Sequence, residues 1–423
     1  MSYTRRVLDD ELDDLLGQIP AILIDGPKGV GKTETALKRA KTVYRLDDPS
    51  VLQIIQADPS GALRDPAPIL IDEWQRFPPI WDAVKRNVDL PKHTGPFIMT
   101  GSAYVPNATV HSGAMRIHDL RMRPMTLTER GVTSPTVSLL ALASGERKVA
   151  GSIEDFGLQN YVQEIVASGF PGIRTLNERA QQAMLDSYLS NIVKKDFPEA
   201  GHKVRKPDSV MAWLRAYAAA TSTTTSYEKI RDASNPRNTT VPAKTTTLAY
   251  IEVLQMLRIL DEVPAWLPGS NFLAELGQAP KHHLVDPALA ARALGMTRKR
   301  LIGGENGPIV YPGQDVLLGA LFESLVTLCV RVYAQVMGAQ LFHLRTRDTR
   351  HEVDLILVTA DGKVIGIEVK LSPQVKSEDV KHLHWLKENA KTSVMDLVVI
   401  TTGNTAFRRS DDVAVIPLAL LGQ

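Results

Sequence analysis

The stretch AILIDGPKGVGKT, residues 21–33, constrains the fold more than any other part of the chain. An apolar strand is followed by the pattern G-x-x-x-x-G-K-[ST] and then by a predicted helix, KTETALKRAKTVY. Glycines let such a loop wrap tightly, so that successive backbone N–H groups and the positive end of the helix face phosphate oxygens. The pattern predicts ATP and Mg²⁺ as cofactors, with Lys32 on the β- and γ-phosphates and Thr33 on Mg²⁺. The predicted nucleotide-binding residues are Gly26, Pro27, Lys28, Gly29, Val30, Gly31, Lys32 and Thr33.

A second buried strand, APILIDE, ends in two adjacent carboxylates, Asp72 and Glu73. Such a pair is costly to bury without a cation, which argues against a purely structural role. Asp72 is predicted to hold Mg²⁺ through water, and Glu73 to polarise the attacking water. Because many simpler GTPases and nucleotide kinases lack the glutamate, the D-E pair favours an ATP hydrolase.

The first part of the chain alternates short apolar strands with helices, which predicts an α/β fold with a parallel sheet and helices on both faces. The strand GPFIMTGSA is expected between the two phosphate-site strands, where Thr100 or Ser102 would sense the γ-phosphate. A simple turn at the end of the strand is the alternative for these residues.

Length and composition describe an ordinary globular protein of two to four domains. The 423 residues carry a net charge of +2, which is too small to argue for nucleic-acid binding by itself. The single cysteine, Cys329, lies in an apolar run and is expected to be buried. The N-terminus turns acidic where a signal peptide would turn apolar, and we find no apolar run long enough to cross a bilayer. These features predict a cytoplasmic protein without a membrane partner.

Four domains are predicted from the changes in pattern along the chain. They are an ATPase core at 1–155, a helical lid at 156–203, a winged-helix-like region at 204–275 and a C-terminal α/β domain at 276–423.

The C-terminal region contains four polar residues in a suggestive order. Glu323 lies on a predicted helix, Asp354 on one strand, and Glu368 and Lys370 on the next, facing the same way. We expect Glu352 on the opposite face of its strand. This order resembles the PD-(D/E)XK nuclease fold, which implies Mg²⁺ held by the carboxylates and a lysine that orients water. The alternative is that the fold is kept and the metal site is not used.

Several motifs together resemble the AAA+-type ATPases of bacteria and archaea that carry an uncharacterised C-terminal domain. They include GPKGVGKT, ILIDEWQRFP, FIMTGSA and MRIHDLRMRPMTLTE, and further matches continue to the C-terminal hairpin. In that group an arginine follows a glycine after the sensor strand, whereas here Arg116 is displaced from the glycine. Arg116 is therefore either a catalytic arginine acting on a neighbouring subunit or a cation at the start of a strand.

The stretch from SYEKIRDASN to DEVPAWLP resembles a winged helix-turn-helix, with Lys229, Arg231, Arg237 and Lys244 near its predicted groove-facing edge. A helical packing module is the alternative, so DNA and a protein are both candidate partners. Three functions stay open: an ATP-driven switch, an ATP-gated metal-dependent DNA nuclease, and a non-catalytic nucleotide-binding module. The sequence does not decide between a monomer and a homo-oligomer.

Overall fold

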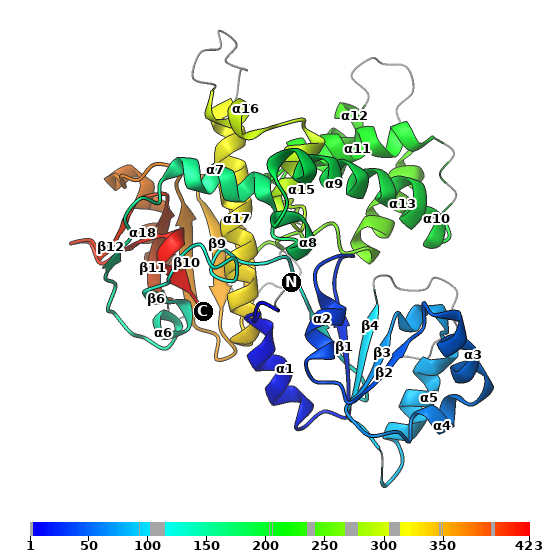
Figure 1. Ribbon diagram of the computed structural model, residues 1–423. Coiled ribbons are helices and arrows are strands. Elements are labelled where there is room, and N and C mark those ends of the chain that lie inside the picture. Colours follow the sequence, from blue (N-terminus) through cyan, green and yellow to red (C-terminus); the bar gives the residue numbers. More distant parts are fainter. Residues whose placement is uncertain are drawn as a thin grey trace.

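The computed structural model describes residues 3–92, 94–101, 115–202, 204, 206–234, 242–266, 278–303, 314–346, 348, 350–390 and 394–423. Figure 1 shows an N-terminal sheet (blue to cyan), a mostly helical middle (green) and a C-terminal sheet (orange to red) beside the long helix α17. The predicted α/β class is confirmed, because the N-terminal sheet is parallel and helices flank it.

The N-terminal sheet has five strands in the order β2-β3-β4-β1-β5, all parallel. Strand β4 therefore separates the strand that leads into the glycine-rich loop from the strand that ends in Asp72. Three of the strands, β1, β3 and β4, are short and largely apolar runs that are mostly buried, as expected for a sheet covered on both faces. The strands are β1 (Ala21–Asp25), β2 (Thr42–Arg45), β3 (Ile69–Asp72), β4 (Phe97–Gly101) and β5 (His118–Arg121).

The helix after the glycine-rich loop is shorter than predicted. Helix α2 ends at Leu37, whereas the sequence pattern predicts a helix as far as Tyr44. The chain instead turns and joins the sheet from Thr42, where strand pairing with Ile69 begins. Tertiary pairing thus overrides the local helical pattern. The helices of this region are α1 (Leu8–Leu16), α2 (Lys32–Leu37), α3 (Pro49–Ala57), α4 (Pro59–Ala62) and α5 (Pro79–Val88).

The middle of the chain is helical and ends in a short paired segment. Residues 259–265 run antiparallel to residues 281–284, through bridges between Leu260 and Leu284 and between Val263 and Lys281. We call residues 258–266 the connecting segment. The helices are α7 (Leu158–Ala167), α8 (Pro171–Arg174), α9 (Glu178–Asn191), α10 (Phe197–Glu199), α11 (Pro207–Ala219), α12 (Tyr227–Ala233), α13 (Lys244–Met256), α15 (Pro287–Ala293) and α16 (Arg298–Ile302).

The C-terminal sheet has seven strands in the order β7-β12-β13-β11-β10-β9-β8. Strands β8, β9 and β10 form an antiparallel meander, and β11 then pairs with β10 in parallel after helix α18. Helix α17 packs on β8. The elements are α17 (Gln314–Val336), β8 (Gln340–Arg345), β9 (Glu352–Val358), β10 (Val364–Val369), α18 (Lys381–Asn389), β11 (Val394–Thr401), β12 (Thr405–Arg408), β13 (Ala414–Pro417) and β14 (Leu421–Gly422).

The segment that follows the N-terminal sheet crosses to the C-terminal sheet. Strand β6 (Val137–Ser138) pairs with β14, helix α6 (Leu139–Ala143) packs on β11, and β7 (Gly151–Ser152) pairs with β12. The predicted boundary at residue 155 therefore does not follow the packing, because residues 137–152 lie against the C-terminal unit.

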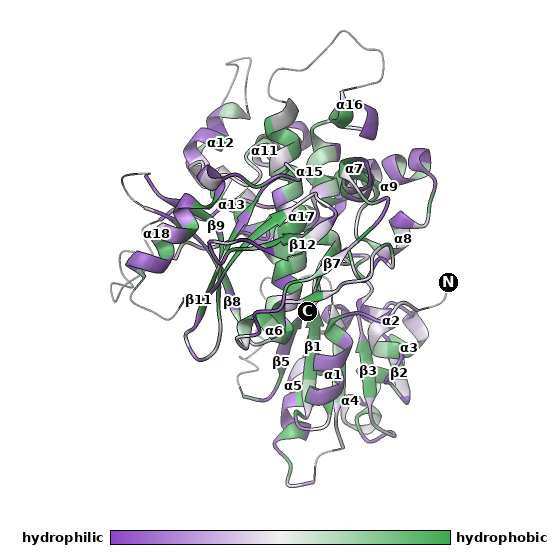
Figure 2. Cartoon of the chain, turned by 90° about the vertical axis from the view of Figure 1, so that its left-hand side faces the viewer, coloured by the Kyte–Doolittle hydropathy of each residue, from purple (hydrophilic) through white to green (hydrophobic). Residues whose placement is uncertain are grey.

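Helix α17 corrects the expectation about apolar runs. The most apolar 18-residue window within its residues 316–336 has a mean hydropathy of 1.8, so by length and composition the helix is sufficient to cross a bilayer. The charged residues Glu323 and Arg331 interrupt this stretch, so it does not stand out in the sequence as one continuous apolar run. In the structure 67% of the most apolar window is buried inside the protein, where α17 contacts α1, α7, α15 and β8. Figure 2 shows it as a green interior helix, whereas α9, α12 and α18 on the outside are largely purple. The packing is that of a core helix.

Candidate functional site

The glycine-rich loop has the backbone that its sequence predicts. Gly29 and Gly31 have φ angles of 79° and 110°, in the left-handed region that favours glycine. A Cβ atom on Gly26 would lie 2.2 Å from the backbone oxygen of Met122. Left-handed residues within a tight turn help neighbouring backbone N–H groups to face one concave side, which suits phosphate oxygens.

Lys32 is buried and folds back on the loop. Its ammonium donates hydrogen bonds to the backbone oxygens of Gly26 at 2.7 Å and Pro27 at 2.9 Å. Burial lowers the pKa of Lys32 to about 8, although the carboxylates of Glu73 and Asp25 act in the opposite direction. An anion placed in the loop would relieve the cost of burying this ammonium.

Three oxygens from separate elements meet beside the loop. The hydroxyl of Thr33 donates to Asp72 Oδ1 at 2.9 Å, and the hydroxyl of Thr100 donates to the same oxygen. Asp72 and Thr100 are 6% and 1% exposed. Hydroxyl and carboxylate oxygens are the donors that Mg²⁺ accepts, so Thr33 and Asp72 fit the predicted cation.

Glu73 follows β3 in a left-handed backbone conformation, with φ 56° and ψ 45°. This conformation is uncommon for a glutamate and is found most often at functional sites. Its carboxylate accepts a hydrogen bond from Gln75 Nε2 at 2.5 Å. The structure thus brings Glu73 and Asp72 to the phosphate end of the sheet, close enough for both to act on the pKa of Lys32.

Arg116 lies at the wrong end of the sheet for a role in its own chain's site. It pairs with Asp89 at 2.6 Å and precedes β5, whose last residue, Arg121, is the one beside Asp25 and the loop. Strand β5 itself, His118–Arg121, lies between Arg116 and the end of the sheet that carries the loop. Arg116 lies two residues before β5, in agreement with the alternative of a cation at the start of a strand, and a role on a neighbouring subunit stays a prediction. Ser102 lies outside the described residues.

Sequence reasoning missed a group of charged residues beside the loop. Asp25, the last residue of β1, pairs with Arg258 of the connecting segment at 2.6 Å and with Arg121 at 3.6 Å. Asp261 pairs with Arg123 at 2.8 Å and Arg331 at 2.6 Å, and the arginines hold the pKa of its carboxyl far below the usual value despite burial. In the sequence, this group is indicated only by Arg331, because it is a lone cation within a predicted apolar helix.

The helical middle also contacts the loop. Lys28 pairs with Asp196 at 2.6 Å and with Glu199 at 3.0 Å, and Tyr188 donates a hydrogen bond to the backbone oxygen of Lys28. Asp196 ends a π-helical turn, an irregularity often found at functional sites. The lid predicted for residues 156–203 thus lies directly on the glycine-rich loop.

The predicted carboxylates of the C-terminal domain surround a lysine. Lys281, from the segment paired with residue 263, is 1% exposed, and its ammonium lies 2.8 Å from Glu323 Oε1 and 3.0 Å from Asp354 Oδ1. Glu352 Oε1 lies 3.9 Å from the same ammonium. The expectation that Glu352 faces away is wrong, because residues two apart on a strand share a face.

Glu368 and Lys370 pair with each other at 3.2 Å. Burial and the neighbouring Asp354 raise the pKa of Glu368 well above its usual value, and among the described residues its Oε1 accepts no hydrogen bond. We call Glu323, Glu352, Asp354 and Glu368 the C-terminal carboxylate cluster. In the part of the chain that the structure describes, no group of three or more His, Cys, Asp or Glu side chains is arranged to hold a metal ion.

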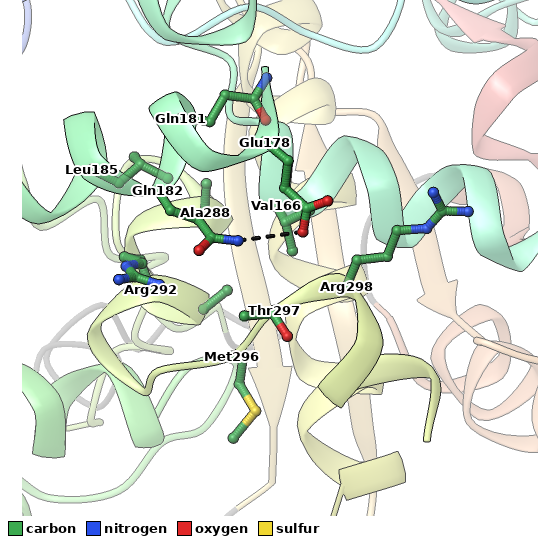
Figure 3. A pocket seen from close by; sticks show the side chains of 11 residues that line it. Val166, Glu178, Gln181, Gln182, Leu185, Ala288, Arg292, Met296, Thr297 and Arg298 are labelled. Atoms are coloured by element: carbon green, nitrogen blue, oxygen red, sulfur yellow. Dashed lines mark hydrogen bonds between the residues drawn. The ribbon is translucent and has the colours of Figure 1, made fainter. Parts of the chain in front are cut away.

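A small cavity in the helical middle is a poor ligand site. It is lined mainly by residues of α7, α9, α15 and α16, and Figure 3 shows Gln182 donating to Glu178 of the same helix, α9, at 3.3 Å. Its volume of about 10 Å³ is close to the space that one water needs.

Comparisons with known proteins agree with the N-terminal geometry. Residues 18–130 match the family model described as an AAA domain. This part of the chain is similar to AAA domains, in agreement with the glycine-rich loop and the parallel sheet described above. Residues 158–300 and 318–421 match two domains of unknown function, DUF8612 and DUF4143.

The whole chain has relatives among uncharacterized proteins. Proteins of Mycobacterium bovis and Mycobacterium tuberculosis are each 22% identical over 429 aligned positions, covering 99% of this chain and 84% of theirs. Among solved structures, a Walker-type ATPase of Pyrococcus abyssi is 13% identical with a TM-score of 0.41, covering 67% of this chain and 94% of that one. The ORC2 protein of Aeropyrum pernix, in ADPNP and ADP complexes, is also 13% identical, with a TM-score of 0.28 over 68% and 89%. Both scores are too low to bear on function.

Proposed function

We propose that the protein is an ATP-binding, magnesium-dependent ATP-hydrolysing switch of AAA+ type. The observation that carries this proposal is the convergence of Thr33, Thr100 and Asp72, because it joins the loop, β4 and β3 at one carboxylate oxygen. Bound Mg²⁺ would neutralise phosphate charge there.

Each residue of the site has a separate role in this proposal. The loop N–H groups and Lys32 bind the phosphates, Thr33 and Asp72 hold the cation, and Thr100 fixes the orientation of Asp72. Glu73 sits on the same end of the sheet with a carboxylate oriented by Gln75, and it would accept a proton from the attacking water.

The switch itself would operate through the contacts of the loop with its surroundings. Lys28 is held by Asp196 and Glu199 of the lid, and Asp25 by Arg258 of the connecting segment. Phosphate charge in the loop competes for both cations, so binding and hydrolysis would change how the lid and the connecting segment sit on the core.

The test is phosphate release by the wild type, Lys32→Ala and Glu73→Gln. We expect Lys32→Ala to lose ATP binding and Glu73→Gln to retain binding but lose at least 100-fold in turnover. Equal turnover in all three proteins would refute the proposal. Tight ATP binding without phosphate release in the wild type would favour the non-catalytic module.

The partner is proposed to be either DNA or a protein, reached through the winged-helix-like and C-terminal regions. Lys244 at the predicted groove edge pairs with Glu228 at 3.4 Å, and Arg231 pairs with Asp232 at 2.8 Å, which lowers the free positive charge available to a phosphate backbone. Arg237 lies outside the described residues. Stimulation of the ATPase by duplex or branched DNA would select DNA, and no stimulation by any DNA would favour a protein.

The nuclease alternative has support from topology but not from its site. Glu323 lies on helix α17, Asp354 on strand β9 and Glu368 on the next strand, β10, in agreement with the order of elements on which the resemblance to PD-(D/E)XK nucleases rests. Lys281, however, pairs with the carboxylates that would hold a metal. Metal-dependent nicking that disappears in Asp354→Ala and Glu368→Ala would restore this alternative.

A further inference from the structure

The ammonium of Lys281 stands where a metal-dependent site would need a divalent cation. It contacts oxygens of Glu323 and Asp354 at hydrogen-bond distances, and Glu352 lies just beyond. Its side chain is 1% exposed, so the contacts are not those of a surface lysine that happens to point inward.

The oxygens of Asp354 are both in use. Oδ1 accepts from Lys281 at 3.0 Å, and Oδ2 accepts from the backbone N–H of Val369 at 2.9 Å. A divalent ion bound by carboxylates needs their oxygens at about 2.0 to 2.6 Å, in the space that the ammonium fills. A second cation placed there would also be repelled by Lys281.

The backbone of Lys281 is fixed as firmly as its side chain. It exchanges two hydrogen bonds with Val263, at 2.8 and 2.9 Å, and the next residue, His282, bonds the backbone oxygen of Thr225 at 2.7 Å. The pairing of Lys281 with Val263 therefore fixes the position of the ammonium, although neither residue belongs to the C-terminal sheet.

We propose that Lys281 is the resident cation of the C-terminal carboxylate cluster and excludes a divalent metal from it. The ammonium of Lys281 neutralises part of the negative charge of the cluster. An internal ion pair therefore takes the place that a metal would occupy in a metal-dependent relative. This inference does not depend on the proposed ATPase function.

The test is a titration of nucleotide-free protein with Mn²⁺. Binding is measured as the loss of the electron paramagnetic resonance signal of free Mn²⁺. Lys281→Met removes the charge and keeps most of the length of the side chain, whereas Lys281→Arg keeps the charge. Asp354→Asn, introduced into each background, assigns any bound Mn²⁺ to the cluster. We expect no Asp354-dependent binding in the wild type or Lys281→Arg. Lys281→Met should bind Mn²⁺ at least tenfold more tightly than the wild type does. Adding Asp354→Asn to Lys281→Met should abolish that gain in affinity.

A thermal melt provides a second readout that needs no activity. Lys281→Met should melt at a lower temperature than the wild type in EDTA and recover with Mn²⁺, while the melting of the wild type should not respond to Mn²⁺. If Lys281→Met does not fold, Lys281→Gln takes its place with the same expectation. Asp354-dependent Mn²⁺ binding by the wild type, or no gain on removing the charge, overturns the proposal.

Discussion

The guanidinium Nε of Arg258 lies 2.6 Å from Asp25 Oδ2, so the connecting segment places a positive charge on the residue that immediately precedes the glycine-rich loop. Arg258 adopts a left-handed backbone with φ 62° to do so. A carboxylate next to a phosphate site repels the ligand, and Arg258 offsets that charge.

Arg258→Ala is therefore expected to weaken ATP binding about tenfold, because it leaves Asp25 without its closest cation; tenfold corresponds to about 1.4 kcal/mol. Titration with a fluorescent ATP analogue measures the Kd. The double variant Asp25→Asn, Arg258→Ala should regain wild-type affinity, since it removes the repelling charge as well. Equal loss in the single and double variants would show that Arg258 acts by some route other than Asp25.

Asp261→Asn is expected to destabilise the protein by about 3 to 5 kcal/mol, because it removes the carboxylate that neutralises buried arginines. Arg123 and Arg331 are each only partly exposed, at 13% and 11%, and both pair with Asp261. Urea unfolding gives the free energy of unfolding. As a matched control, Asp89→Asn breaks the exposed pair with Arg116 and should change stability by less than about 1 kcal/mol.

The buried imidazole of His343 should make stability depend on pH. Burial lowers the pKa of His343 to about 4, so the folded state resists protonation that the unfolded chain accepts near pH 6.5. Its contribution to stability is present above pH 6.5 and is lost as pH falls toward 4, by about 3 kcal/mol in all. Unfolding curves at pH 7, 5.5 and 4 for the wild type and His343→Asn test this. The variant should show a smaller loss over that interval, and equal losses would exclude His343 as the cause.

Cys329 should be unreactive in the folded protein. It is fully buried in α17, and burial raises the pKa of its thiol to about 11, so little thiolate exists at pH 8. Alkylation by iodoacetamide should therefore require opening of the core, and it should accelerate sharply in denaturant. Rapid modification without denaturant would contradict the packing of α17 described here.

Local patterns predicted the arrangement of the N-terminal loop and strands because the residues concerned lie in short contiguous motifs. A strand, a glycine-rich loop and a D-E pair each specify their backbone and position within a few residues, and Thr100 follows from the strand order. Lys281, Arg258 and Asp261 could not be found in this way. Their partners lie between 42 and 233 residues away in sequence, and only the folded arrangement brings them together. The face of Glu352 was predictable, because alternation along β9 places it on the same side as Asp354.

Without β7, strand β12 would be at the edge of the C-terminal sheet. Strand β7 is its hydrogen-bonded neighbour and comes from residues 151–152, more than 250 positions earlier in the chain. A fragment beginning after that point would display an unpaired strand edge to other molecules, and such edges promote aggregation. Residues 151–152 thus complete a sheet that is otherwise built from the C-terminal part of the chain. A protein cut after them would expose an aggregation-prone strand edge and would not be an independent folding unit.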